Sequence, residues 1–272
     1  MKLLDLLDDL RAECIAVRQL VQSLPDADWE RSTPALGWNV AHQIGHLAWT
    51  DAMSSIAVAT MLDAGDTAAQ HAWRAVVEGA MSAPDTFVND GATEFAALPP
   101  AQLMARWDNE RELLHDRLGR VDSAARIPWF GPPMKSTSMA TARLMETWAH
   151  GLDIADALGA QTFPTDRIRH VCHLGFATRA FAYLGRGMDL PERDVALDLI
   201  GPGGDSWTWG PADAEQRITG TAWDFARVAV RRVHASDTEL LATGKDAQTW
   251  LGIVQAFAGP PGSDPQPSAA PE

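Results

Sequence analysis

Cysteine, tyrosine and long apolar runs are all scarce in this chain. Its two cysteines, Cys14 and Cys172, have no CxxC spacing and are too few for a disulfide framework. We interpret them as small buried hydrophobic residues, with a cysteine nucleophile as the alternative. No stretch approaches the roughly 20 apolar residues that span a bilayer, and the N-terminus carries acids where a signal peptide has an apolar run. The expected protein is therefore soluble and cytoplasmic, without a membrane partner.

Positive charge is also in deficit, since 22 lysines and arginines face 36 aspartates and glutamates. The net charge of −14 repels nucleic-acid backbones and anionic membrane surfaces, so no nucleic-acid partner is expected. The sequence contains neither HExxH nor G-x-S-x-G, which excludes the metalloprotease and nucleophile-elbow motifs. The glycine-rich stretch 201–204 lacks the lysine and the following helix of a phosphate loop.

Helical periodicity dominates the first 160 residues. Apolar residues make up 46% of the chain, enough for one or two cores, and here they recur at spacings of three and four. Ser32, Thr33 and Pro34 are typical of a helix start. The segment 83–98 is expected to be a loop with one extra turn, and the prolines of 128–133 predict an irregular, stiff loop. Helices are expected over residues 3–24, 39–53 and beyond, 68–81, 100–118 and 137–158.

The pattern changes after Gly159, which is expected to end the last of these helices. Alternating apolar residues on both sides of the 201–204 turn predict a β-hairpin, and residues 215–219 can add a strand. Further helices are expected over 165–185, 222–232 and 248–257. The resulting prediction is mainly helical, with a bundle domain at 1–160, a small α+β domain at 161–258 and a disordered tail at 259–272.

One pair of residues suggests a metal site. Glu146 and His150 lie one helical turn apart, so both side chains emerge on the same face and can reach one ion together. A third ligand must then come from another helix, for which His46 is the candidate. Two histidines and one carboxylate leave room for water or substrate, as in catalytic zinc sites. On spacing alone, such a pair is more often an intrahelical hydrogen bond or part of a solvated face, and His46 also fits a satisfied core residue.

Several neighbours of these residues have more than one interpretation. Arg143 can receive a carboxylate group of a bound ligand, or form an ion pair with Asp153 or Glu146. Asp153 can orient a ligand histidine or remain an exposed carboxylate. Most of the 11 tryptophans fall at core-facing spacings, so packing explains them; Trp49 and Trp148, next to the candidate ligands, are candidate pocket walls.

Two segments carry a resemblance to a known family. Residues 37–49, GWNVAHQIGHLAW, and residues 146–154, ETWAHGLDI, look like the metal-binding segments of the mycothiol-dependent maleylpyruvate isomerase family. The resemblance spans nearly the whole chain. It implies a DinB-like four-helix bundle followed by a small α+β domain likened to sterol-carrier domains. In that family the matching residues bind zinc, and they correspond to His46, Glu146 and His150 in this sequence.

The chain departs from the family pattern at one position. Family members commonly have an acidic residue four positions before the ligand histidine, where this chain has His42. We interpret His42 as an outer partner of the metal site, as a proton shuttle or as a packing residue. Because of this difference, the resemblance does not establish that the site has the isomerase's fine geometry or that the chain is the isomerase itself.

The resemblance also implies a function. A divalent metal, zinc or another, would activate a low-molecular-weight thiol such as mycothiol for attack on a small electrophilic substrate, giving S-transfer or isomerisation. His42, Arg143 and Asp153 are then the catalytic candidates, and Trp49 and Trp148 would contact the thiol. Two alternatives stay open: a zinc-dependent hydrolase with His42 as proton acceptor, and a carrier of a small apolar ligand. An actinobacterial-type monomer or homodimer is expected.

Overall fold

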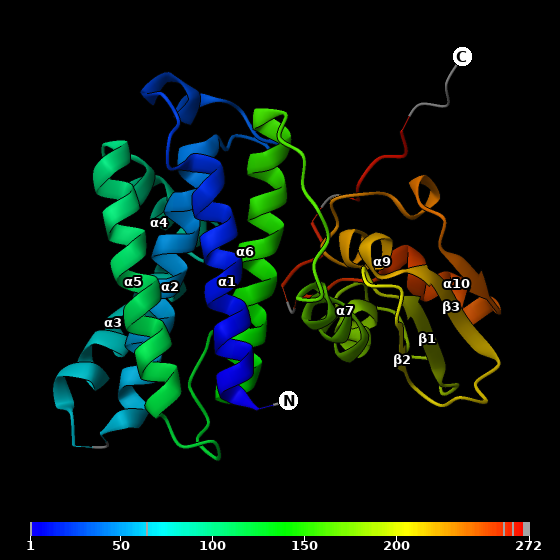
Figure 1. Ribbon diagram of the computed structural model, residues 1–272. Coiled ribbons are helices and arrows are strands. Elements are labelled where there is room, and N and C mark those ends of the chain that lie inside the picture. Colours follow the sequence, from blue (N-terminus) through cyan, green and yellow to red (C-terminus); the bar gives the residue numbers. More distant parts are fainter. Residues whose placement is uncertain (1, 64, 258, 263, 269–272) are drawn as a thin grey trace. The chain divides into compact units, whose positions relative to one another are not determined.

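The computed structural model describes residues 2–63, 65–257, 259–262 and 264–268. It divides into two compact units, Met1–Thr162 and Phe163–Glu272. The first is helical and the second combines helices with a small sheet, which confirms the predicted fold class (Figure 1). None of the described helices has both the length and the apolar character needed to cross a membrane.

Four long helices build the first unit (Figure 1). The second of them packs against the third and the fourth and against two shorter helices, whereas the first packs mainly against the fourth. Each long helix buries an apolar stripe, and burial of such stripes is what holds helices of this length together in water. The long helices are α1 (Leu3–Val21), α2 (Val40–Leu62), α5 (Pro100–Arg120) and α6 (Ser136–Leu158).

The ends of α2 and α6 follow local sequence signals. The Asn39 side chain accepts a hydrogen bond from the His42 backbone N–H at 3.0 Å and so caps α2. The helix-start signal at Ser32 and Thr33 is therefore not the one used: Ser32 pairs with Asn39 in an isolated β-bridge, and the 3-10 helix η1 (Asp26–Glu30) precedes it. Gly159 ends α6 as expected, with a φ of 63° in the left-handed region.

The expectation of a loop at 83–98 was wrong. Helix α4 (Phe87–Ala96) lies there, after α3 (Thr67–Ser82), and packs directly on α2. Its own sequence favours a helix only weakly, because it contains glycine, asparagine, aspartate and threonine. Small residues compensate by permitting close contact: Gly45 of α2 faces the α4 backbone, and Gly91 of α4 lies under the Trp49 ring. Tertiary packing therefore overrides propensity in this segment.

Gly45→Ala is expected to lower the free energy of unfolding by about 1–3 kcal/mol, the usual cost of overpacking. Its Cβ would lie 2.6 Å from Ala92 O and 2.9 Å from Ala96 N, and backbone atoms cannot move away cheaply. Gly119→Ala in α5 is the matched control, because its Cβ would meet Leu7 at an ordinary 3.8 Å and gain up to about 1 kcal/mol of helix propensity. Urea unfolding of both variants checks this, and equal effects would contradict it.

The second unit contains a four-stranded sheet with the strand order β2-β1-β3-β4. The predicted hairpin is confirmed by antiparallel pairing of β1 with β2, in which Leu199 faces Trp207. Strand β3 runs parallel to β1, and the unpredicted short strand β4 lies antiparallel to β3. The strands are β1 (Val195–Ile200), β2 (Ser206–Trp209), β3 (Gln216–Thr221) and β4 (Leu241–Thr243).

The helices of this unit differ in part from expectation. The single helix expected at 165–185 is divided at Thr178, whose hydroxyl oxygen lies 2.8 Å from the backbone oxygen of Leu174 and 2.5 Å from that of Gln255. The last helix ends at Ile253 rather than at 257, because Val254 is extended and Ala256 N–H bonds to Ala229 O at 2.7 Å. The helices are α7 (Ile168–Ala177), α8 (Arg179–Leu184), α9 (Ala222–Ala229), η2 (Ala235–Asp237) and α10 (Lys245–Ile253).

The predicted disorder of 259–272 falls partly on residues 263 and 269–272, which lie outside the described residues. In the described part of this segment, Asp264 forms ion pairs with Arg231 and Arg186. The backbone N–H of Ser268 also donates to Asp237 Oδ2 at 2.8 Å.

Candidate metal centre

His46 of α2 and Glu146 and His150 of α6 come together in the first unit, although His46 and Glu146 are 100 positions apart in the sequence. His46 Nε2 lies 3.2 Å from Glu146 Oε2, and the two imidazole rings have their centroids 4.5 Å apart. One possible ligand atom from each residue lies within 4.8 Å of the other two. Helix packing thus creates the three-residue cluster that the spacing and the resemblance suggested.

Arg143 supports this cluster from inside the bundle. Its Nη1 donates to Glu146 Oε2 at 2.7 Å, and its Nε donates to Asp51 Oδ1 at 2.9 Å. Asp51 also accepts from the indole N–H of Trp107 at 3.2 Å. Arg143 is only 2% exposed, so of its two interpretations the structure supports the ion pair, with Glu146 and Asp51 as partners. No sequence motif indicates Asp51. An acidic residue among the apolar residues of α2 nevertheless indicates a buried carboxyl group that needs a partner.

Electrostatics keep Glu146 and Arg143 charged. Burial by itself would raise the pKa of the Glu146 carboxyl, but hydrogen bonding with His46 and the charge of Arg143 hold that pKa below its usual range. Burial would lower the pKa of Arg143, but the negative charges of Asp51 and Glu146 outweigh it and raise the pKa. An ionised carboxylate beside two imidazoles is a donor set that suits a divalent metal.

His150 has two further polar neighbours. Its Nδ1 lies 2.5 Å from Oε1 of Gln43, a fully buried residue that the sequence analysis missed. The same nitrogen lies 3.8 Å from Asp153 Oδ2. Asp153 is buried rather than exposed, so its carboxyl group is part of the immediate surroundings of His150.

Trp38 and Trp49 border the cluster. The indole of Trp38, from the loop before α2, stacks on His150 with centroids 5.9 Å apart and lies 5.3 Å from His46. Trp49 has its centroid 6.5 Å from His46 and contacts Phe87 edge-on. Trp148 is buried, but its position two residues from both Glu146 and His150 places it on the opposite face of α6. Trp38, like Gln43 and Asp51, was not among the site residues predicted from the sequence.

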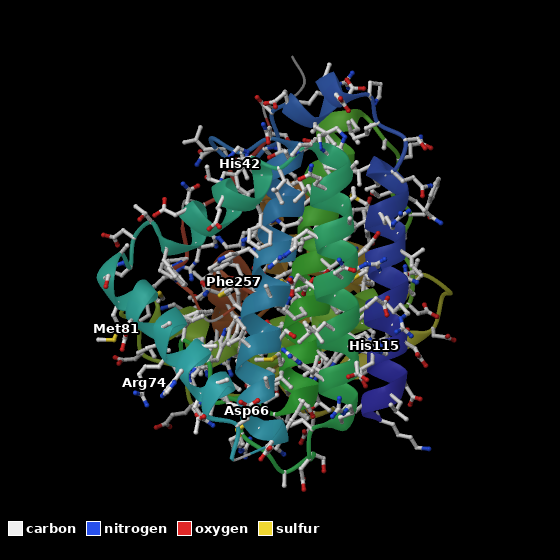
Figure 2. The ribbon with its side chains drawn as sticks, turned by 90° about the vertical axis from the view of Figure 1, so that its left-hand side faces the viewer. His42, Asp66, Arg74, Met81, His115 and Phe257 are labelled. Carbon is white, nitrogen blue, oxygen red and sulfur yellow. The ribbon has the colours of Figure 1, made fainter. Side chains whose placement is uncertain are left out.

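His42 takes part in a helix cap. Its Nδ1 lies 2.6 Å from Asn39 Oδ1 and 3.5 Å from Asn39 N, which completes a capping box at the start of α2. Figure 2 labels His42 near this end of the bundle, apart from His115 of α5, which contacts Arg11 at 3.2 Å. The group of three candidate ligands found among the described residues includes neither histidine.

Neither cysteine is placed to act as a nucleophile. Both side chains are buried. Burial, with a smaller effect of Asp51, raises the pKa of the Cys14 thiol to about 12, and burial also raises the pKa of Cys172. Both thiols therefore stay protonated at neutral pH, as expected of small buried hydrophobic residues.

Comparison with known families places these residues in context. The sequence profile of the mycothiol maleylpyruvate isomerase N-terminal domain matches residues 10–155, more than half of the chain. The chain belongs to this family. All three candidate ligands, together with Gln43, Asp51 and Arg143, lie inside the matched region.

Two similar proteins match the chain along most of its length. Two Mycobacterium tuberculosis proteins, from strains CDC 1551 / Oshkosh and ATCC 25618 / H37Rv and both described as uncharacterized, are 48% identical over 254 residues. The match covers 93% of this chain and 95% of each relative.

Solved structures show the same fold. The mycothiol-dependent maleylpyruvate isomerase matches with a TM-score of 0.58 at 16% identity, and a histidine-to-alanine mutant of it matches with 0.61 at 15%. Each comparison covers 89% of this chain and 93% of the solved chain. This member of the mycothiol maleylpyruvate isomerase family thus shares the family's enzyme fold over both of its units.

Proposed function

We propose that this chain is a metal-dependent enzyme that activates mycothiol, or a closely related thiol, for reaction with a small electrophilic substrate. The observation that carries the proposal is the convergence of His46, Glu146 and His150 from two helices. Family membership and the likeness to mycothiol-dependent maleylpyruvate isomerase support the thiol and favour isomerisation over S-transfer.

The donor set fits a zinc ion. Zinc–nitrogen and zinc–oxygen bonds of about 2.0–2.2 Å at tetrahedral angles separate neighbouring ligand atoms by roughly 3.3–3.6 Å. The 3.2 Å between His46 Nε2 and Glu146 Oε2 is close to that separation. Arg143 holds the same carboxylate oxygen from the side of the bundle interior, so the direction of Glu146 is fixed.

A divalent ion held by these side chains would keep positions open and favour the thiolate form of a bound thiol at neutral pH. In the chemistry we propose, the thiolate adds to an electrophilic carbon–carbon double bond of the substrate. Rotation about the resulting single bond and elimination of the thiolate give the isomer and return the thiol. S-transfer, by contrast, would leave the sulfur bonded to the product.

Thiol stoichiometry distinguishes these reactions. Zinc-loaded protein, mycothiol in amounts far below the substrate, and maleylpyruvate as the first electrophile are expected to give many turnovers per thiol, with the thiol recovered. No turnover is expected when the thiol is omitted. Consumption of one thiol per product would assign S-transfer. Turnover without any thiol would contradict the proposal, and hydrolysis products formed in that reaction would support the hydrolase. Binding of apolar ligands without any turnover would support the carrier.

A further inference from the structure

We infer that Gln43 is a positioning residue that fixes the tautomer of His150 and thereby presents the Nε2 of that imidazole to a metal. The inference deepens the proposed function, because it concerns a ligand of the proposed metal site. It rests on a chain of hydrogen bonds between α6, α2 and the loop that precedes α2.

The chain of contacts is continuous. His150 Nδ1 lies 2.5 Å from Gln43 Oε1, and Gln43 Nε2 lies 2.7 Å from Thr33 Oγ1. The Thr33 hydroxyl in turn lies 3.0 Å from the backbone oxygen of Trp38. Gln43 is 0% exposed, so water does not compete for its amide, and an unmatched polar atom there would be costly.

The chemistry of each group sets the direction of each hydrogen bond. The Trp38 carbonyl can only accept, so the Thr33 hydroxyl donates to it. The Thr33 oxygen then accepts from the Gln43 NH₂ group, which turns the amide oxygen toward His150. An amide oxygen can only accept, so Nδ1 of His150 carries the proton. In the neutral imidazole the lone pair is then on Nε2, which is the nitrogen that can bind a metal.

Two neighbours of the ring act in the same direction. Oδ2 of Asp153 is a hydrogen-bond acceptor 3.8 Å from Nδ1 and favours the proton on that nitrogen. Trp38 stacks on the ring and restrains its rotation. The buried Nδ1 of His46, by contrast, has no hydrogen-bond partner among the described residues. Gln43 therefore fixes the tautomer of His150 through a contact that Nδ1 of His46 does not make.

Gln43→Met tests the inference, because methionine keeps the length of the side chain and removes the acceptor. Its zinc affinity, measured by competition with a chromogenic chelator, is expected to fall about 10–100-fold, as is usual when an outer partner of a ligand histidine is lost. In the metal-free variant, long-range ¹H–¹⁵N NMR is expected to show His150 moving from the Nδ1–H toward the Nε2–H tautomer. Gln43→Glu retains an acceptor and is expected to restore the Nδ1–H tautomer.

A matched control separates positioning from general loss of stability. Gln216→Met removes another buried amide, whose Oε1 accepts from Asp246 N at 2.9 Å in the second unit. It is expected to lose stability with no change in zinc affinity. If Gln43→Met fails to fold, Thr33→Val serves instead, because the freed amide can turn and weaken the preference for Nδ1–H.

Unchanged zinc affinity and an unchanged tautomer in a folded Gln43→Met or Thr33→Val variant would overturn the inference. So would an Nε2–H tautomer of His150 in the metal-free wild type. A wild type that takes up no zinc would instead reject the proposed function, and the tautomer of its His150 would still decide the role of Gln43.

Discussion

Glu146→Gln is expected to abolish most of the zinc binding and the thiol-dependent activity while leaving the bundle folded. Glutamine has nearly the same volume and still offers an oxygen to Arg143, but it removes the single negative charge among the three candidate ligands. Loss of an outer partner of a ligand lowers metal affinity by up to roughly 100-fold, and loss of a ligand itself should lower it further. The expected decrease in zinc affinity is therefore more than about 100-fold.

Elemental mass spectrometry of purified protein gives the measurement. About one equivalent of divalent metal is expected in the wild type, as in a mononuclear site, and little in His46→Ala, Glu146→Gln or His150→Ala. His42→Ala is the control, because His42 belongs to the capping box: it should keep the metal and lose about 1 kcal/mol of stability. Metal retained in Glu146→Gln, or lost in His42→Ala, would show that the ligands are assigned wrongly.

A wild type that holds no metal and cannot be reconstituted would remove the basis of the catalytic proposal. The carrier of a small apolar ligand would then be the hypothesis to pursue.

Arg143→Met is expected to lower the free energy of unfolding by about 3–5 kcal/mol, the usual cost of breaking a buried ion pair. Asp51 is 3% exposed and would lose the guanidinium 2.9 Å from its Oδ1. Glu146 would lose a partner as well. Urea unfolding of the metal-free protein measures the effect without a contribution from bound metal.

Two comparison variants make this prediction specific. Arg106→Met breaks the ion pair with Glu110 on α5, where the arginine side chain is 51% exposed, and should cost at most about 1 kcal/mol. Arg143→Met combined with Asp51→Leu removes both charges and should recover much of the loss, because no unpaired Asp51 carboxylate remains buried. A loss no larger in Arg143→Met than in Arg106→Met would contradict a structural role for the buried pair.

Local sequence signals predicted those elements whose pattern is complete within one segment. The three- and four-residue spacing of apolar residues indicated the four long helices, and Gly159 marked the end of α6. Helix α4 lacked such a signal, because its stability comes from contact with Gly45 and Trp49 of another helix. Thr178 likewise divides a predicted helix by bonding to Gln255, which is 77 residues away.

The sequence by itself determined the helical fold class, the hairpin of the second unit, and the one-turn spacing that brings Glu146 and His150 to one face of α6. Tertiary structure alone decided the partners of these side chains. Arg143 meets Asp51 and Gln43 meets His150 only because α2 and α6 pack together, about 100 residues apart in the chain. Helical periodicity specifies which residues share a face, but the distances and hydrogen bonds between faces arise when burial of apolar surface brings the helices into contact.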